Sequence, residues 1–207
     1  VGMGFDLPRI ELELPQGLPA EFILYLGRKE RGKNLDLLCK YLAHYNDRPH
    51  AKQISLVIAG SGEIDFYDQL PDWIVDLGFV SAEQKRGLMQ EALCLCQPSI
   101  NESFSIVLME SWLEQVPVIV HAACDVTREH VIKANGGLYF ANQFEFEQVV
   151  DTLRSDSALR KNCGQSGYEY VVSHYNWASV LAKFACALEA IGSKNVMANT
   201  YFSSRVI

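Results

Sequence analysis

The chain has 207 residues with 25 acidic and 18 basic side chains, which gives a net charge of −7. This balance argues against DNA or RNA as the main partner, because a nucleic-acid backbone requires a broad basic face. A small phosphate ligand is compatible with it, since such a ligand needs only a few local cations. Hydrophobic residues make up 49% of the chain and charged residues 21%, which is ordinary for a soluble globular domain.

Six cysteines are scattered along the chain, and none forms the C-x-x-C pair of a zinc or thioredoxin motif. Cys94 and Cys96 flank one residue of an apolar run, so at strand period we expect both to be buried on the same face. Unpaired cysteines are typical of a reducing compartment, and no apolar run approaches the ~18 residues of a membrane span. We therefore expect a cytoplasmic protein.

Short apolar runs alternate with stretches of helical period along most of the chain. Strands are predicted at 22–26, 54–59, 73–79, 93–98, 117–120 and 138–140. Helices are predicted at 34–45, 81–92, 104–114, 127–133, 144–153, 157–175 and 177–191. Strands that are apolar throughout and separated by helices predict a parallel sheet covered on both faces. The fold class is therefore α/β, a Rossmann-like doubly wound sheet of about six strands with a helical C-terminal end.

This predicted domain covers residues 1–192, and its first six residues look like a connector between domains. Residues 193–207 show no clear period and are predicted to be a C-terminal tail or an arm that crosses to another domain. Ligands of doubly wound folds bind beyond the carboxyl ends of the strands, where the strand order reverses. The loops after the first, second and fourth predicted strands are therefore the candidate binding loops.

The loop after the first strand, residues 27–34, is basic. Four of the 18 basic residues of the chain lie between positions 28 and 33. Arginine supplies a planar fork and lysine a compact point charge, which together suit a diphosphate. A solvated charged turn that precedes a helix is an equally good explanation of the same residues.

The loop after the second strand contains Gly60 and Gly62. Glycine permits a close backbone approach or a positive φ, as a phosphate or sugar loop requires. A short glycine-rich turn after a strand is also very common, so this loop is a weak indicator by itself.

The loop after the fourth strand leads into an apolar helix. The backbone amides around Phe104, Ser105 and Ile106 are expected to be unpaired donors at a helix N-terminus, which attracts phosphate through hydrogen bonds and dipole. Glu110 lies two turns further on among apolar residues, where a carboxylate needs a partner. Two partners are considered for Glu110: a ribose diol, which can donate two hydrogen bonds, and a structural Lys or Arg. Glu102 has two explanations as well, a contact to the ligand and a surface charge at the helix N-terminus.

Glu102 and Glu110 are separated by seven residues and match the E-x7-E motif of the group 1 retaining glycosyltransferases, which have the two-domain GT-B architecture. Arg28 and Lys33 resemble the basic pair that binds the diphosphate in the C-terminal domain of that family. Further segments resemble the family in the same order along the chain and cover about residues 20–190. They are Gly78-Phe79-Val80, Pro117-Val118 and Asn135-Gly136-Gly137-Leu138.

The resemblance implies a role for each matching residue. Arg28 and Lys33 would neutralise the diphosphate leaving group, and Glu110 would hold the ribose of the donor. Glu102 would act with Arg28 and Lys33 as the catalytic set and would contact the donor sugar. The donor contacts implied in addition are Ser103, Phe104, Ser105, Ile106, Gly60, Gly62 and Phe79, the last of these beside the base.

The implied function is transfer of a sugar from a UDP-, GDP- or ADP-sugar to an acceptor with retained anomeric configuration. Members of this architecture need no bound metal, and no cofactor is expected besides the nucleotide-sugar substrate. The chain would be the donor-binding half, inactive without an N-terminal acceptor domain and acting on a glycan or at the inner face of a membrane. Alternatives are a non-catalytic nucleotide-sugar-binding module and a GT-B sugar-nucleotide epimerase.

This sequence departs from the family pattern at several positions. Ser103 and Ser105 stand where many relatives carry glycine, which is expected to narrow the space beside the donor sugar. Gln115 replaces the glycine that usually ends the helix of the E-x7-E motif. These changes remove no charge that the implied chemistry needs, so they bear on the identity of the donor more than on the fold.

Overall fold

A computed structural model describes residues 3–6, 11–49 and 52–203 of the chain, with side chains described as far as residue 191. The chain divides into two compact units. One consists of residues 8–170, and the other of residues 1–7 with 171–207. The larger unit contains the whole sheet and every predicted site residue, so the fold of this unit decides the geometry of the candidate site.

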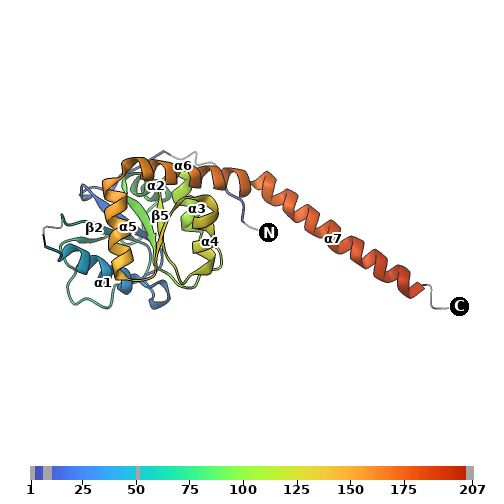
Figure 1. The fold of residues 1–207 in the computed structure, drawn as a ribbon, viewed down its shortest axis with the longest axis horizontal. Coiled ribbons are helices and arrows are strands. Elements are labelled where there is room, and N and C mark those ends of the chain that lie inside the picture. Colours follow the sequence, from blue (N-terminus) through green and yellow to red (C-terminus); the bar gives the residue numbers. More distant parts are fainter. Residues whose placement is uncertain (1–2, 7–10, 50–51, 204–207) are drawn as a thin grey trace. The chain divides into compact units, whose positions relative to one another are not determined.

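A six-stranded parallel sheet forms the centre of the larger unit (Figure 1). Its strands are β1 (Phe22–Leu26), β2 (Ser55–Ala59), β3 (Ile74–Asp76), β4 (Cys94–Gln97), β5 (Val118–His121) and β6 (Gly137–Phe140). They lie in the order β3-β2-β1-β4-β5-β6, and every neighbouring pair is parallel. The predicted doubly wound α/β fold is therefore confirmed, although β3 is shorter than the predicted strand at 73–79.

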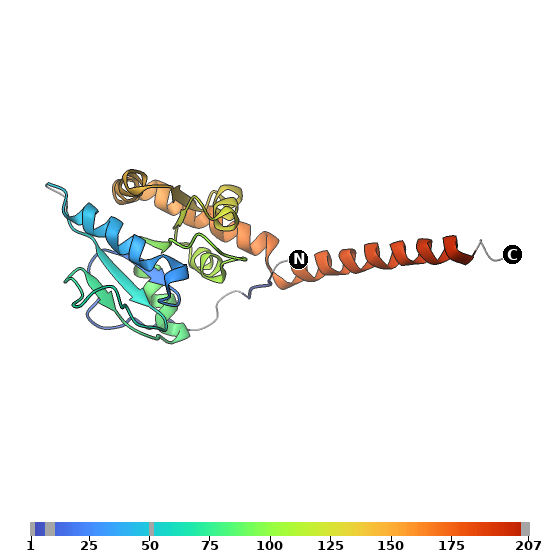
Figure 2. The same cartoon turned by 90° about the horizontal axis from the view of Figure 1, so that it is seen from below.

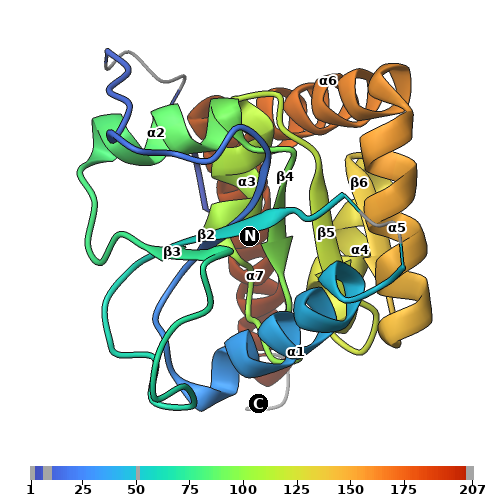
Figure 3. The ribbon, with the colours of Figure 1, turned by 90° about the vertical axis from the view of Figure 1, so that its left-hand side faces the viewer.

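Helices connect the strands and follow the last of them along the chain. Those that begin in the larger unit are the 3-10 helix η1 (Arg31–Lys33) and the α-helices α1 (Leu35–Asn46), α2 (Ala82–Glu91), α3 (Ile106–Leu113), α4 (Asp125–Ala134), α5 (Gln143–Ser155) and α6 (Ser157–His174), and the smaller unit contains α7 (Trp177–Ser203). The connection from β1 to β2 and the connection from β4 to β5 run in opposite directions across the sheet. Because such crossovers are right-handed, α1 and α3 lie on opposite faces (Figure 3).

The face that carries α1 and α5 has a continuous apolar core. Alternate residues of the strands point into it, among them Ile23 and Tyr25 of β1, and both are completely buried. Cys94 and Cys96 belong to the same core cluster, as their spacing in the sequence predicts. The predicted helix at 104–114 begins later, at Ile106, because Ser105 has a left-handed backbone with φ of 68°. Ser105 therefore fixes the start of α3.

The smaller unit consists mainly of α7, which continues as one helix to Ser203 (Figure 2). The helix predicted at 177–191 is therefore longer than its sequence period indicates, and the tail or crossover arm predicted at 193–207 stays a prediction, with residues 204–207 outside the described part. The backbone amide of Phe5 donates to the carbonyl of Tyr175 at 2.8 Å, so the N-terminal segment runs beside the start of α7. In the described part of the chain, no helix has both the length and the apolar character needed to cross a membrane.

Candidate functional site

The candidate site lies at the carboxyl ends of β1 and β4, which are neighbours in the sheet. The chain leaves these two strands toward opposite faces, so the loops that follow them separate and form the crevice in which doubly wound folds bind ligands. Residues 27–34 form the first loop and residues 98–105 the second. These are two of the three loops that the sequence predicts as binding loops.

Lys33 and Glu102 join the two loops directly. The Nζ of Lys33 lies 2.7 Å from Oε1 of Glu102, and the two side chains are 20% and 10% exposed. The side-chain amide of Gln97, at the end of β4, donates to the same carboxylate oxygen at 3.1 Å. The side-chain amide of Asn34 donates to the carbonyl of Pro98 at 3.3 Å. Glu102 is therefore a partly buried carboxylate held by a cation, and not a surface charge.

Arg28 lies apart from this pair. Its guanidinium forms an ion pair with Glu30 at 3.0 Å, and its side chain is 68% exposed. The backbone at Arg28 is fixed, because the hydroxyl of Tyr25 donates to its carbonyl at 2.7 Å. Burial raises the pKa of Tyr25 above its usual value, so this hydroxyl stays protonated and remains a donor. The structure therefore joins Lys33 to Glu102 but leaves Arg28 extended into solvent beside them.

The N-terminus of α3 opens onto the same crevice. Ser105 is the N-cap residue, but its side chain accepts no hydrogen bond from the helix. Its Oγ is the one buried side-chain oxygen or nitrogen that has no hydrogen-bond partner among the described residues. A helix end without a side-chain cap leaves its first backbone amides available as hydrogen-bond donors, and their use by a phosphate stays a prediction.

The other residues of this loop differ in their exposure. The side chains of Ser103 and Ile106 are exposed, whereas Phe104 is half-buried. The ring of Phe104 packs edge-on against His130 of α4, with ring centroids 5.3 Å apart. Phe104 therefore anchors the loop against α4, and any donor contact at this position would come from its backbone, which is the contact that the resemblance implies.

Glu110 has a partner that the sequence analysis did not name. The Nζ of Lys85, on α2, lies 2.5 Å from its Oε1, and both side chains are half-buried. Of the two kinds of partner considered for Glu110, a ribose diol and a basic side chain, the structure contains the basic side chain. The only sequence signal for Lys85 is its place just beyond the Ser81 capping box, in the helix that follows the Phe79 segment. The pair lies 25 residues apart, so spacing alone could not reveal it.

The glycines after β2 are required by neighbouring backbone. A Cβ on Gly60 would lie 1.9 Å from the carbonyl oxygen of Gly27, and φ of Gly60 is 144°. Gly62 has φ of 100° and lies against Lys29. Contact between adjacent loops therefore explains both residues without a ligand. Phe79, after β3, differs from them because its side chain is 86% exposed.

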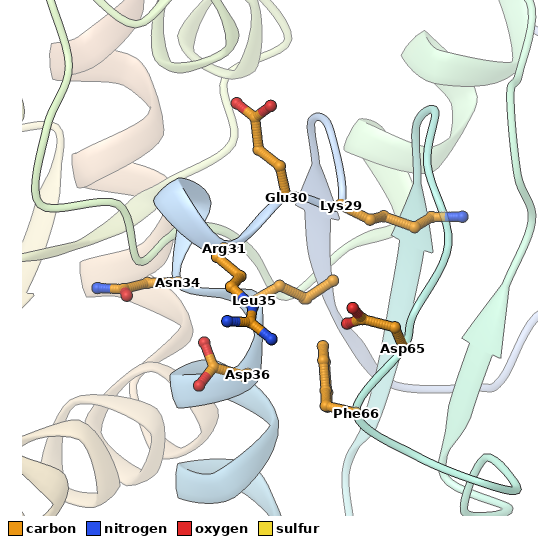
Figure 4. A pocket seen from close by; sticks show the side chains of 8 residues that line it. All are labelled: Lys29, Glu30, Arg31, Asn34, Leu35, Asp36, Asp65 and Phe66. Carbon is orange, nitrogen blue, oxygen red and sulfur yellow. The ribbon is translucent and has the colours of Figure 1, made fainter.

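A hollow of about 390 Å³ lies beside η1, on the side of the loop that faces residues 65–66 (Figure 4). Arg31 points into it between Asp36 and Asp65, while Lys29 points away from it. Neither Lys33 nor Glu102 lines this hollow. The η1 turn therefore presents Lys33 to the crevice between β1 and β4 and Arg31 to a separate surface.

The fold and the two facing loops define a doubly wound α/β domain with opposite charges at the strand-order reversal. The family described as "Glycosyl transferases group 1" matches residues 13–170. The chain therefore belongs to the group 1 glycosyl transferases, and its fold is that of the C-terminal domain of the GT-B architecture. The resemblance seen in the sequence is confirmed at the level of family and fold.

Three known proteins illustrate the likeness. An uncharacterized glycosyltransferase of Methanocaldococcus jannaschii is 28% identical over 186 residues, which cover 83% of this chain and 46% of that protein. Sucrose-phosphate synthase of Thermosynechococcus elongatus superposes with a TM-score of 0.69 at 22% identity, over 86% of this chain and 47% of the other. The Anabaena protein HepE in complex with UDP-glucose gives a TM-score of 0.67 at 18% identity, over 82% and 49%. The chain thus spans about half the length of the relatives that it matches.

Proposed function

We propose that this chain is the donor-binding half of a retaining glycosyltransferase that uses a nucleotide-sugar. The observation that carries the proposal is the contact between Lys33 and Glu102 at the strand-order reversal, beside an uncapped helix N-terminus. Family membership supports glycosyl transfer as the class of reaction. The HepE structure, which holds UDP-glucose, supports a nucleotide-sugar as the ligand.

In the proposed reaction, the bond between the anomeric carbon and the diphosphate oxygen breaks, and a bond to the oxygen of an acceptor hydroxyl forms on the same face of the sugar. The proton of that hydroxyl passes to the departing diphosphate. Negative charge develops on the departing diphosphate. Lys33 would turn from Glu102 toward this charge, Arg28 would swing in from solvent, and the amides of Ser105 and Ile106 would donate to it. Once in place, such donors stabilise the transition state electrostatically. We propose that they do so without a metal ion or a further cofactor.

Glu102 would then be free to accept hydrogen bonds from hydroxyls of the donor sugar, together with the backbone at Ser103 and Phe104. Glu110 would accept from the ribose diol. Lys85 would keep the carboxylate of Glu110 oriented while the ribose binds, because its ammonium group lies at hydrogen-bond distance from Oε1. Phe79 would contact the base from the loop after β3.

The acceptor would be bound by an N-terminal domain that lies outside this chain, as the length of the relatives suggests. We therefore propose that the chain alone binds donor without turnover, in the cytoplasm or at the inner face of a membrane. A non-catalytic nucleotide-sugar-binding module of the same family remains the second candidate. It is favoured by the left-handed backbone of Ser105 and by its buried hydroxyl, which has no hydrogen-bond partner among the described residues. A GT-B epimerase is the third.

The first test is a thermal-shift panel of this chain with UDP, GDP, ADP and their common sugar conjugates. A ligand at 100 times its dissociation constant stabilises the folded state by about 2.7 kcal/mol. We expect a shift with one nucleotide, lost in Glu110→Ala and kept in the matched control Glu129→Ala on the exposed face of α4. Absence of any shift, in this chain and in the two-domain protein, would contradict the donor site.

A second measurement separates the three candidates. The two-domain protein with its nucleotide-sugar and acceptor should release free nucleoside diphosphate progressively and form a glycosylated product with retained configuration. Binding without release would favour the non-catalytic module. Conversion of the donor into an epimeric sugar without an acceptor would favour the epimerase.

A further inference from the structure

Lys29 has a position unlike that of the other basic residues in its loop. Its side chain is only 3% exposed, and its Nζ lies 2.7 Å and 2.8 Å from the two carboxylate oxygens of Asp76, at the end of β3. The side chain of Asp76 is itself 23% exposed. The residues are 47 positions apart, so the pair connects the loop after β1 with the end of β3.

The burial of the lysine side chain in this pair indicates more than a contribution to stability. Removal of an ammonium group from water is costly, and an ion pair recovers that cost only when its geometry is good, so a covered pair is weak evidence for stabilisation. Its two short distances fix the position of both partners. The exposed pair of Lys40 and Asp36 in the same unit has side chains that are 71% and 40% exposed and imposes no such constraint.

Backbone hydrogen bonds extend the constraint through the loop after β2. The amide of Lys29 donates to the carbonyl of Ser61 at 2.9 Å, and the amide of Gly60 donates to the carbonyl of Gly78 at 2.7 Å. The close approach of Gly60 to the loop after β1 leaves no room for a side chain at that position. The loops after β1, β2 and β3 are therefore bonded to one another in series.

Asp76 is the point at which this series meets the segment that follows β3. One of its oxygens, Oδ1, accepts from the amide of Gly78 at 3.0 Å while the carboxylate holds Lys29. Gly78 has a left-handed backbone with φ of 64°, and the strongly exposed Phe79 comes directly after it. The direction in which Phe79 leaves the sheet therefore depends on the carboxylate of Asp76, and through it on Lys29.

We infer that Lys29 and Asp76 are positioning residues that fix the segment carrying Phe79 relative to the diphosphate loop, and so set where the base of a nucleoside diphosphate is held. The inference rests on the proposed function, because it takes Phe79 as the base contact. Arg28 is the immediate neighbour of Lys29, so the same pair sets the distance between the diphosphate-binding end and the base-binding end of the site. Neither Lys29 nor Asp76 needs to touch the ligand.

The test measures nucleotide affinity in variants of this chain by isothermal titration, at a temperature well below unfolding. The probe is UDP, or GDP or ADP if one of those shifts the wild-type protein in the panel above. We expect Asp76→Asn and Lys29→Met each to weaken binding by about tenfold, since small displacements of a positioned group are costly. Lys29→Arg keeps the charge and should restore most of the affinity. Glu129→Gln, in the exposed pair with Lys133, should bind as the wild type does.

A double variant shows whether the pair acts through Phe79. If it does, Asp76→Asn added to Phe79→Ala should weaken binding no further than Phe79→Ala alone, because the positioned group is already absent. Losses that multiply, or full affinity in both single variants, would overturn the inference. A lower melting temperature with unchanged affinity would make the pair merely structural and would also overturn it. A wild-type chain and a wild-type two-domain protein that bind none of the three nucleotides would instead overturn the proposed function.

Discussion

The Nζ of Lys33 lies 2.7 Å from Oε1 of Glu102, although the two residues are 69 positions apart in the sequence. One follows β1 and the other follows β4, so the contact spans the place where the strand order reverses. In the absence of ligand, each group neutralises the other inside a partly covered crevice. A bound diphosphate would attract Lys33 and release Glu102 for the donor sugar, so the pair is the resting arrangement of the proposed site.

This relationship predicts the outcome of a double-mutant cycle on stability. Lys33→Met leaves a carboxylate that is 10% exposed without its cation, and we expect the free energy of unfolding to fall by about 1–3 kcal/mol. Glu102→Gln leaves the partly buried lysine unpaired and should also be destabilising. The double variant has no unpaired charge and should lose less than the sum of the two. Urea denaturation checks this, and strictly additive losses would show that the contact carries no coupling.

The fold was predictable from the sequence because its signals are local. Strands β1, β2 and β4 are short apolar runs that stop just before a glycine or a proline, at Gly27, Gly60 and Pro98. These signals and the order of the motifs suffice for the doubly wound sheet and for the loops that carry Lys33 and Glu102. Helix starts were less predictable, since the left-handed backbone at Ser105 delays α3 to Ile106 in an otherwise apolar helical stretch.

The partners of the site residues were not predictable in the same way. Lys85 meets Glu110, and Lys29 meets Asp76, only because α2 and β3 are brought beside α3 and the β1 loop by the folded sheet. Spacing in the sequence carries no trace of such pairs. The glycines after β2 illustrate a related limit: their pattern in the sequence suggests a ligand loop, and the contact with Gly27, which by itself requires glycine at position 60, could not be seen from it.

The backbone conformation of Ser105 predicts that its replacement by glycine will stabilise the folded protein. Its left-handed φ of 68° costs an L-residue about 1–2 kcal/mol, and its buried hydroxyl has no hydrogen-bond partner among the described residues. We expect Ser105→Gly to raise the free energy of unfolding by about 1 kcal/mol or more. Ser103→Gly is the matched control two residues away: it is exposed, has no positive φ, and should be neutral or slightly destabilising. A destabilised Ser105→Gly would mean that the hydroxyl has a stabilising role.

The burial of His130 predicts that the folded protein loses stability at mildly acidic pH. Burial lowers the pKa of this histidine, which packs against Phe104 and lies 3.0 Å from the hydroxyl of Tyr170. The unfolded chain then binds a proton before the folded protein does, so stability is complete above the unfolded pKa of about 6.5 and declines as pH falls toward the folded pKa. One proton limits the slope to about 1.4 kcal/mol per pH unit, and partial exposure keeps it well below that.

The measurement is urea denaturation from pH 8 to pH 5 on the wild type and on His130→Gln. We expect the variant to have a shallower decline below about pH 6.5. The decline should not vanish, because burial also lowers the pKa of His121. Identical slopes in the two proteins would show that His130 titrates in the folded state as it does in the unfolded chain.

The packing around Trp112 predicts that Gly167 of α6 cannot be replaced without a loss of stability. Its indole is completely buried, and its N–H donates to the carbonyl of Gly136 at 2.8 Å. A Cβ on Gly167 of α6 would lie 2.2 Å from the ring, so Gly167→Ala must displace the indole or the helix, at a cost of about 1–3 kcal/mol. Gly32→Ala is the matched control, because a Cβ there meets nothing within 4 Å and the residue has no positive φ. Chemical denaturation of both variants is the measurement. Equal stability would mean that the contact between α3 and α6 can relax without cost. A loss of stability confined to Gly167→Ala would show that a rigid indole holds α3, and with it the loop of Glu102, against the rest of the domain.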